Sequence, residues 1–171
     1  GLIDMHVHLR EPGQEYKETI ETGCRAAAYG GFTAVCPMPN TDPVNDNPSV
    51  TNYIIEKAKQ VSIVRILPVG AVTKGLKGKE LAEMGLMKEA GIVAVSDDGQ
   101  PIEDASILRR ALEYGATYNL PLISHCQDRN LSASGVMNEG ALSSQLGLPG
   151  IPASSEDVMV ARDIIVAKST G

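Results

Sequence analysis

The chain has 171 residues and a net charge of −6 without any basic run, so neither nucleic acid nor an anionic membrane surface is an expected partner. No apolar run is long enough to span a bilayer, which argues against a membrane protein. Its three cysteines are widely spaced and form no CxxC pair. They therefore argue against a disulfide framework and favour a cytoplasmic location.

The first predicted element is a strand over residues 2–9, in which apolar and polar residues alternate. Its polar face carries Asp4, His6, His8 and Arg10, and its apolar face Ile3, Met5, Val7 and Leu9. Residues two apart on one face lie about 6.6 Å apart, so His6 and His8 can bind one metal ion. Two histidines packed in a polar core are the alternative interpretation of this pattern alone. Because the chain starts inside a strand, without methionine or a leader, we expect a segment of a longer polypeptide.

Similar strand-like runs begin near residues 2, 32, 63, 92 and 121, at the spacing of one βα unit. Helical patterns follow each run, with expected starts near Ile20, after the N-caps Asn47 and Asp104, and near Glu80 and Ser154. We expect one strand over residues 63–69. The helix after Ser154 is expected to begin with a capping box to Asp157 and to bury the stripe Val158, Ala161, Ile164 and Ile165.

Three connections stand out between these elements. Residues 37–43 contain three prolines and predict a structured loop at the end of the second strand. Residues 73–79 are rich in Gly and Lys but lack a phosphate-binding spacing, so they indicate a solvated connection. Residues 127–153 are too long for an ordinary connection and predict a functional loop beside a substrate.

Five βα units fit either a doubly wound sheet or the first part of a (β/α)8 TIM-type barrel. The first strand decides between them, because its polar face does not suit a strand covered by helices on both sides. A barrel interior accepts such a face near its C-terminal mouth. We therefore expect residues 1–171 to be the N-terminal part of a single α/β barrel domain. A complete barrel needs about 250 residues, so the first and fifth strands would be open edges in this chain.

Two further strand ends supply candidate ligands. Asp97 and Asp98 follow the fourth strand, and His125 follows the fifth. Imidazole with carboxylate suits Zn2+, with manganese or cobalt as alternatives. A surface turn is the alternative interpretation of Asp97-Asp98-Gly99, but its position opposite the two histidines of the first strand favours a metal site.

The segment Asp4-Met5-His6-Val7-His8 resembles the first-strand metal motif of the amidohydrolase superfamily. A longer set of segments resembles the type I dihydroorotases: residues 8–13, 38–41, 96–99, 124–126 and 138–140. This resemblance implies that His6 and His8 bind one zinc ion, that Asp98 bridges two ions, and that His125 binds the second. It also implies Arg10 and Asn40 as the residues that hold a substrate carboxylate, which suits the fork of arginine.

The implied reaction is the reversible cyclisation of N-carbamoyl-L-aspartate to L-dihydroorotate in pyrimidine biosynthesis. In the family the general base is an aspartate of the eighth strand, and a further histidine ligand comes from the sixth. The sequence contains neither, so no catalytic residue is expected within this span, and the resemblance places the catalytic aspartate beyond Gly171. We expect little or no turnover from these residues alone.

Two alternatives remain, a related hydrolase of hydantoin or allantoin type and, from a different class, a non-catalytic scaffold for another pyrimidine enzyme such as aspartate transcarbamoylase. Hydantoinases and allantoinases carry a carboxylated lysine as bridging ligand, and the fourth strand here ends in aspartate instead. A non-catalytic scaffold would have lost metal ligands, and none expected in this span is missing. The resemblance further implies two partners, a second copy in a homodimer and aspartate transcarbamoylase.

Overall fold

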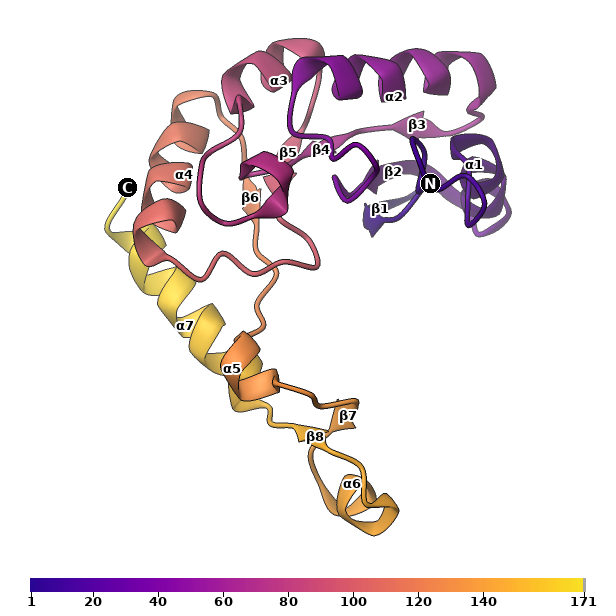
Figure 1. The fold of residues 1–171 in the computed structure, drawn as a ribbon. Coiled ribbons are helices and arrows are strands. Elements are labelled where there is room, and N and C mark those ends of the chain that lie inside the picture. The colour runs from indigo at the N-terminus through magenta and orange to yellow at the C-terminus, as the bar shows by residue number, and fades with distance from the viewer. Residues whose placement is uncertain (171) are drawn as a thin grey trace.

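The structure is a computed structural model that describes residues 1–170, so that Gly171 lies outside the described residues. Helices and parallel strands alternate along most of the chain, and they form an arc with helices on its outer side and strands within (Figure 1). The predicted α/β architecture is confirmed. Among residues 1–170, no helix is both long and apolar enough to cross a membrane.

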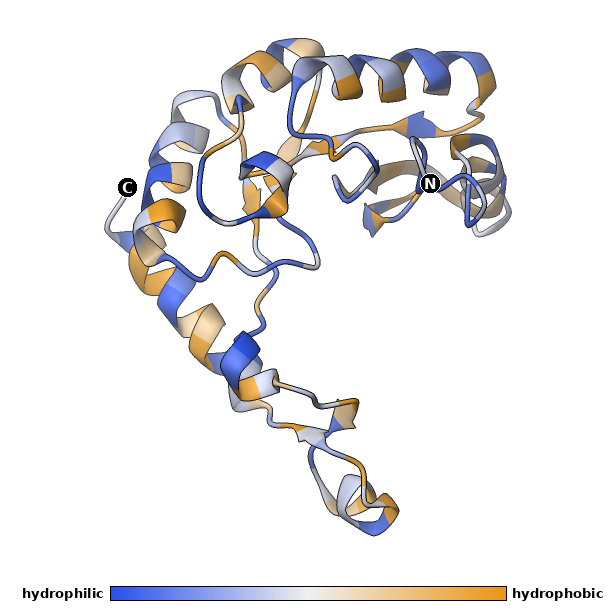
Figure 2. Cartoon of the chain, in the orientation of Figure 1, coloured by the Kyte–Doolittle hydropathy of each residue, from blue (hydrophilic) through white to orange (hydrophobic). Residues whose placement is uncertain are grey.

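The first sheet contains β1 (Leu2–Val7), β2 (Phe32–Pro37) and β3 (Arg65–Ile66), all parallel and in that order. Its crossovers are α1 (Ile20–Tyr29) and α2 (Pro48–Val61). As predicted, the side chain of Asn47 caps α2. The helices pack on the strands through one apolar cluster: Leu9, Ile20, Cys24, Val35, Val50 and Ile54. The apolar sides of these helices are visible in Figure 2.

The second sheet contains β4 (Val69–Gly70), β5 (Ala94–Ser96) and β6 (Leu122–Ile123), also parallel and in sequence order. Its helices are α3 (Met84–Ala90) and α4 (Ala105–Thr117), and the short 3-10 helix η1 (Lys74–Leu76) precedes α3. Asp104 caps α4 as predicted. The core of this half includes Met84, Met87, Ile92, Val95 and Leu108.

The single strand predicted over residues 63–69 is wrong, because the structure divides it into β3 and β4 at Leu67-Pro68. Leu67 donates its N–H to Val35 of β2, whereas Pro68 has no N–H and only accepts, from Val93 beside β5 (3.0 Å each). The chain thus leaves the first sheet and enters the second within two residues. The helix predicted from Glu80 begins later, at Met84, because Ala82 donates to Val72 in an extended pairing.

The outer strands are edges, as predicted. Among residues 1–170, β1 pairs only with β2 and β6 only with β5. The apolar face of β1 is only partly covered. Leu9 is buried, whereas Ile3 and Met5 are 61% and 70% exposed.

Residues 127–153 are not the long loop that the sequence predicts. They contain α5 (Arg129–Ser132), β7 (Met137–Asn138), α6 (Ala141–Leu146) and β8 (Gly150–Ile151). β7 and β8 pair in parallel, and the segment extends away from the arc (Figure 1).

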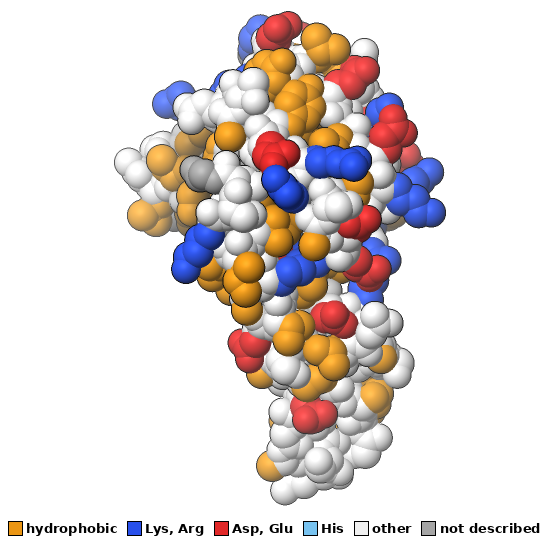
Figure 3. All heavy atoms as spheres, turned by 90° about the vertical axis from the view of Figure 1, so that its left-hand side faces the viewer, with side chains coloured by type: hydrophobic (Ala, Val, Ile, Leu, Met, Phe, Trp, Pro, Cys, Tyr) orange, Lys and Arg blue, Asp and Glu red, His pale blue; other side chains and the backbone are white. Residues whose placement is uncertain are grey.

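The final helix, α7 (Ser154–Lys168), packs along α4 with a different face from the predicted one. Met159 is buried, whereas Val158, Ile164 and Ile165 are exposed. Figure 3 shows this side of the molecule, with apolar side chains lying among charged ones. The predicted capping box is also wrong. Ala153 is the N-cap, and the backbone carbonyls of Pro152 and Ala153 accept the first N–H groups.

Two glycines with positive φ offer a matched test of loop packing. Gly13 (φ +93°) lies after β1, where an added Cβ would be 1.8 Å from the carbonyl oxygen of Asp42. Gly31 (φ +83°) has open space around the same position. We expect Gly31→Ala to lower the free energy of unfolding by about 1–2 kcal/mol, the conformational cost alone. Gly13→Ala should cost more, because it also forces the loops 10–14 and 39–43 apart. Urea denaturation of both variants measures the difference, and equal losses would contradict the predicted clash.

Candidate metal centre

His6 and His8 lie at the C-terminal end of β1, where the strand alternation directs both rings to one side. The main chain is fixed there because Met38, just after β2, donates its N–H to the carbonyl oxygen of Val7 (2.9 Å). The ring centroids are 5.2 Å apart and the ring planes are inclined by 72°. The two imidazoles therefore face a common point rather than stacking on each other.

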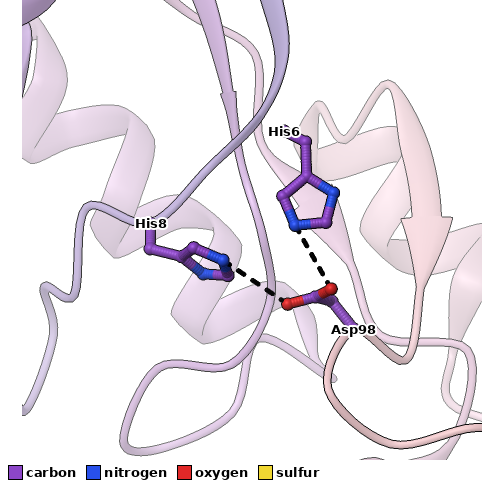
Figure 4. A group of neighbouring side chains, drawn as sticks. All are labelled: His6, His8 and Asp98. Atoms are coloured by element: carbon purple, nitrogen blue, oxygen red, sulfur yellow. Dashed lines mark ion pairs between the residues drawn. The ribbon is translucent and has the colours of Figure 1, made fainter. Parts of the chain in front are cut away.

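Asp98 provides the carboxylate at that point. It follows β5, is only 7% exposed, and comes within 3.2 Å of His6 Nε2 through Oδ1 and 3.6 Å of His8 Nε2 through Oδ2 (Figure 4). One ligand atom from each of the three residues lies within 4.8 Å of the other two. Two imidazole nitrogens and a carboxylate oxygen are a donor set typical of zinc sites with open coordination positions.

Asn40 links two members of this group. Its Nδ2 donates to Asp98 Oδ2 and its Oδ1 faces His8 Nδ1, both at 3.1 Å. Because an ionised carboxylate only accepts hydrogen bonds, the amide orientation is determined. His8 then donates from Nδ1, and in the neutral form of the ring the lone pair of Nε2 is on the side of Asp98.

Asp97 has a different role from its neighbour. Its carboxylate is buried and accepts hydrogen bonds from the N–H groups of Val72 (2.8 Å) and Thr73 (3.0 Å) and from the Thr73 hydroxyl. Burial raises the pKa of Asp97, and these hydrogen bonds oppose the rise. Of the two aspartates that the sequence offered, Asp98 thus faces the histidines and Asp97 fixes the end of β5.

His125 reaches the same carboxylate from β6. Its Nδ1 is 3.6 Å from Asp98 Oδ1, and its Nε2 lies 3.3 Å from Gln127 Oε1. His125 lies outside the compact group of His6, His8 and Asp98. A cavity of about 570 Å³ opens between them, lined by His6, Asp98 and His125 and by residues of the 127–153 segment and α7.

Arg10 is half-buried two residues after His8, at a positive φ of 60°. Within residues 1–170, the structure does not bring Arg10 into the group of His6, His8 and Asp98. The next residue, Glu11, is 4% exposed and fixes this loop, because its carboxylate accepts from Ile20 N at the start of α1 (2.8 Å) and from the Tyr53 hydroxyl (3.1 Å). Lys57 Nζ lies 3.5 Å from the same carboxylate.

Sequence reasoning missed the residues that fix the site. Glu11 is one. Another is Asn45, fully buried, whose side chain donates to Val69 O (2.9 Å) and accepts from Thr51 (2.7 Å). A third is Asp163 of α7, which accepts from Ser124 and Cys126 on either side of His125. A signal was present for the last, because two polar residues that alternate with a predicted ligand on a strand need a polar partner behind it.

A family described as dihydro-orotase-like matches residues 1–171. The chain is 61% identical over 171 residues to a dihydroorotase of Solibacter usitatus and 58% identical over 170 residues to one of Desulforapulum autotrophicum. It is covered almost completely in both alignments, but it spans only 40% of the length of each of these relatives.

Solved structures share the fold. An L-hydantoinase (dihydropyrimidinase) from Arthrobacter aurescens superimposes with a TM-score of 0.73 at 20% identity, covering 100% of this chain and 40% of its own. A dihydroorotase from Saccharomyces cerevisiae, in complex with 5-fluoroorotic acid, gives 0.63 at 16% identity, covering 98% and 44%. At these identities the likeness concerns the fold alone.

The neighbours Asp97 and Asp98 allow a direct test of their different roles. Asp97→Ala should lower the free energy of unfolding by about 2 kcal/mol or more, because buried N–H groups lose a charged acceptor. Asp98→Ala should change it by about 1 kcal/mol or less in metal-free protein, because no backbone N–H depends on it. Urea denaturation in the presence of a chelator measures both. A larger loss for Asp98→Ala would contradict this division of roles.

Proposed function

Because this chain belongs to the dihydro-orotase-like family, we propose that its protein is a metal-dependent dihydroorotase. The reaction is the reversible cyclisation of N-carbamoyl-L-aspartate to L-dihydroorotate. The observation that carries the proposal is the convergence of His6, His8 and Asp98 at two strand ends, in a chain whose curated relatives bear the name dihydroorotase.

The residues present suit a divalent metal ion. Asp98 is buried, and three imidazoles and one amide face it. Among residues 1–170, no lysine or arginine lies within ion-pair distance of its carboxylate. We assign His6 and His8 to one zinc ion, His125 to a second, and Asp98 to both. Zinc in such a site supplies Lewis acidity, which polarises a carbonyl group and makes water more acidic.

Arg10 and Asn40 are the proposed ligands of the substrate carboxylate. Both proposed substrates carry a carboxylate, and the guanidinium of Arg10 matches that group with two parallel hydrogen bonds. The contact of Asn40 with His8 and Asp98 supports this assignment, because it places a directional amide directly beside the proposed metal group. Binding at Arg10 and Asn40 therefore orients the substrate relative to the metal group.

No residue of this chain is assigned as general base. The cavity lined by His6, Asp98 and His125 is also lined by Glu156, but the resemblance assigns the base to an aspartate of a later strand. We propose that the base and the sixth-strand histidine come from residues outside this sequence. The expected position of the aspartate, beyond Gly171, lies outside the described residues 1–170 and stays a prediction.

The assembly of the whole protein is also a proposal. Residues 1–171 would form the N-terminal part of a single (β/α)8 barrel, and the parallel strand order of the two sheets supports this arrangement. A cytoplasmic location, a homodimer and an association with aspartate transcarbamoylase remain predictions.

Metal binding is the first test. Isothermal titration of metal-free protein with Zn2+ should show that His6→Ala/His8→Ala weakens binding by more than about 100-fold, beyond the 10–100-fold typical of a lost outer partner. Asp4→Ala is the matched control, since Asp4 shares the polar face of β1 and, among residues 1–170, its side chain is hydrogen-bonded to the N–H of His6 (3.1 Å) and lies outside the group of His6, His8 and Asp98. Equal affinities of the control and the double variant would contradict the metal assignment.

Substrate choice is the second test. The protein that contains this sequence should hydrolyse L-dihydroorotate in preference to hydantoin and dihydrouracil, which lack the carboxylate. Arg10→Gln should raise KM for L-dihydroorotate by about 10-fold or more, because it removes a charge-assisted bidentate contact, and should leave the Zn2+ affinity unchanged. Faster hydrolysis of hydantoin would favour the hydantoinase alternative, and zinc binding without turnover of any of the three would favour the scaffold.

A further inference from the structure

Both sequence neighbours of His125 bind one carboxylate. The Ser124 hydroxyl and the Cys126 thiol donate to the same oxygen of Asp163, Oδ2, and the sulfur lies 3.7 Å from it. Asp163 belongs to α7, 39 residues after Ser124 in the sequence. The carboxylate therefore lies behind the segment that carries His125.

The contacts of these three residues run in two directions. Ser124 and Cys126 both contact Asp163 of α7, whereas the imidazole of His125 lies near Asp98 and Gln127. Because Asp163 holds the first two toward α7, the imidazole of His125 is directed to the opposite side, where Asp98 Oδ1 lies 3.6 Å away. A rotation of this segment that turned the imidazole away from Asp98 would break both contacts with Asp163.

The sheet does not provide this constraint. β6 contains only Leu122 and Ile123, and its last ladder partner is Ser96 opposite Ile123. Beyond that point, the main chain is held by a turn at Gln127, whose N–H donates to His125 O (3.2 Å), and by Asp128 N donating to Ser155 O (2.7 Å) at the start of α7. The contacts with α7 thus replace the ladder that the strand lacks here.

Asp163 is itself fixed. Its other oxygen, Oδ1, accepts from Arg162 Nε at 2.8 Å, and Arg162 Nη2 lies 2.7 Å from it. Arg162 Nη1 donates to the carbonyl oxygen of Glu103, just before α4 (2.9 Å). One oxygen of the carboxylate is therefore engaged by a guanidinium tied to a second element, and the other remains for Ser124 and Cys126.

We infer that Asp163 is a positioning residue for His125: it sets the direction of this imidazole by holding Ser124 and Cys126 together. The inference rests on the proposed function for what His125 is positioned to do, namely to bind a metal ion. The geometry of the clamp, defined as Ser124, Cys126 and Asp163, is independent of it.

A simple tether between α7 and β6 is the competing explanation, and it predicts loss of stability alone. Asp104→Ala is a suitable control, because Asp104 is an exposed helix cap whose carboxylate accepts from Ser106 N (2.7 Å) at the start of α4. Ser124→Ala/Cys126→Ala is the cleaner test variant. It removes both donors but keeps the pairing of Asp163 with Arg162, so it remains informative if Asp163→Ala fails to fold.

The first measurement uses metal-free protein labelled with 15N-histidine, with signals assigned from single histidine variants. Both clamp variants should shift or split the ring signal of His125 and leave those of His6 and His8 in place. Asp104→Ala should move none of them. An unchanged His125 signal in Ser124→Ala/Cys126→Ala would overturn the inference, even if the protein binds no metal at all.

The second measurement is Zn2+ affinity of the same variants by competition with a chelator. The clamp variants should bind the His125-dependent ion 10–100-fold more weakly, the usual effect of losing an outer partner. Removing the clamp in a His125→Ala background should have no further effect, because the two act on the same ligand. Additive losses would overturn the inference. Absence of zinc binding in the unsubstituted protein would contradict the proposed function, and the histidine signals would still decide the inference.

Discussion

A buried carboxylate must be compensated, because an isolated charge away from water is costly. Asp98 is such a group, and its partners among the described residues come from three places: His6 and His8 from the end of β1, Asn40 from the loop after β2, and His125 from the end of β6. The arc of parallel strands is what makes this arrangement feasible, since it turns the C-terminal ends of β1, β5 and β6 toward a common region. The chemistry of the site therefore depends on the curvature of the sheets.

The strands bring these residues near one another, but the ends of strands are loops, and loops need their own constraints. For three of these loops a buried polar side chain close in sequence supplies one. Asp97 fixes the turn that carries Asp98, Glu11 ties the loop of Arg10 to α1 and α2, and Asn45 ties the loop of Asn40 to β4. These residues use charge or amide groups to satisfy backbone N–H and C=O groups, so their burial is compensated and each also orients a neighbour.

The elements and the convergence of His6, His8 and Asp98 were predictable from the sequence for different reasons. The N-caps and the apolar spacing predict where helices such as α2 and α4 begin. His6 and His8 stand out because histidine is rare in this chain and the two residues alternate on a strand.

The end of a strand is not marked by a periodic pattern in the sequence. The division at Pro68 depends on which neighbouring strand pairs with the chain, and tertiary contacts determine this pairing. The face of α7 shows the same limit, because its apolar residues occur on several sides. The structure buries Met159 and partly buries Val166, whereas Ile164 and Ile165 are exposed. The buried polar anchors are harder still, since a carboxylate such as Glu11 or Asp163 has the appearance of a surface residue until the donors from distant elements are known.

The first sheet (β1, β2 and β3) and the second sheet (β4, β5 and β6) contact each other across the site in a different way from neighbouring strands within one sheet. Inside a sheet, neighbouring strands share backbone hydrogen bonds. Between β1 and the ends of β5 and β6, the contacts are instead those of imidazole and amide groups with one carboxylate. Side-chain contacts of this kind leave lone pairs of the imidazoles and the carboxylate available for a metal ion in the proposed site. Among residues 1–170, β1 and β6 are edges, and under the proposed function the ligand binds between them.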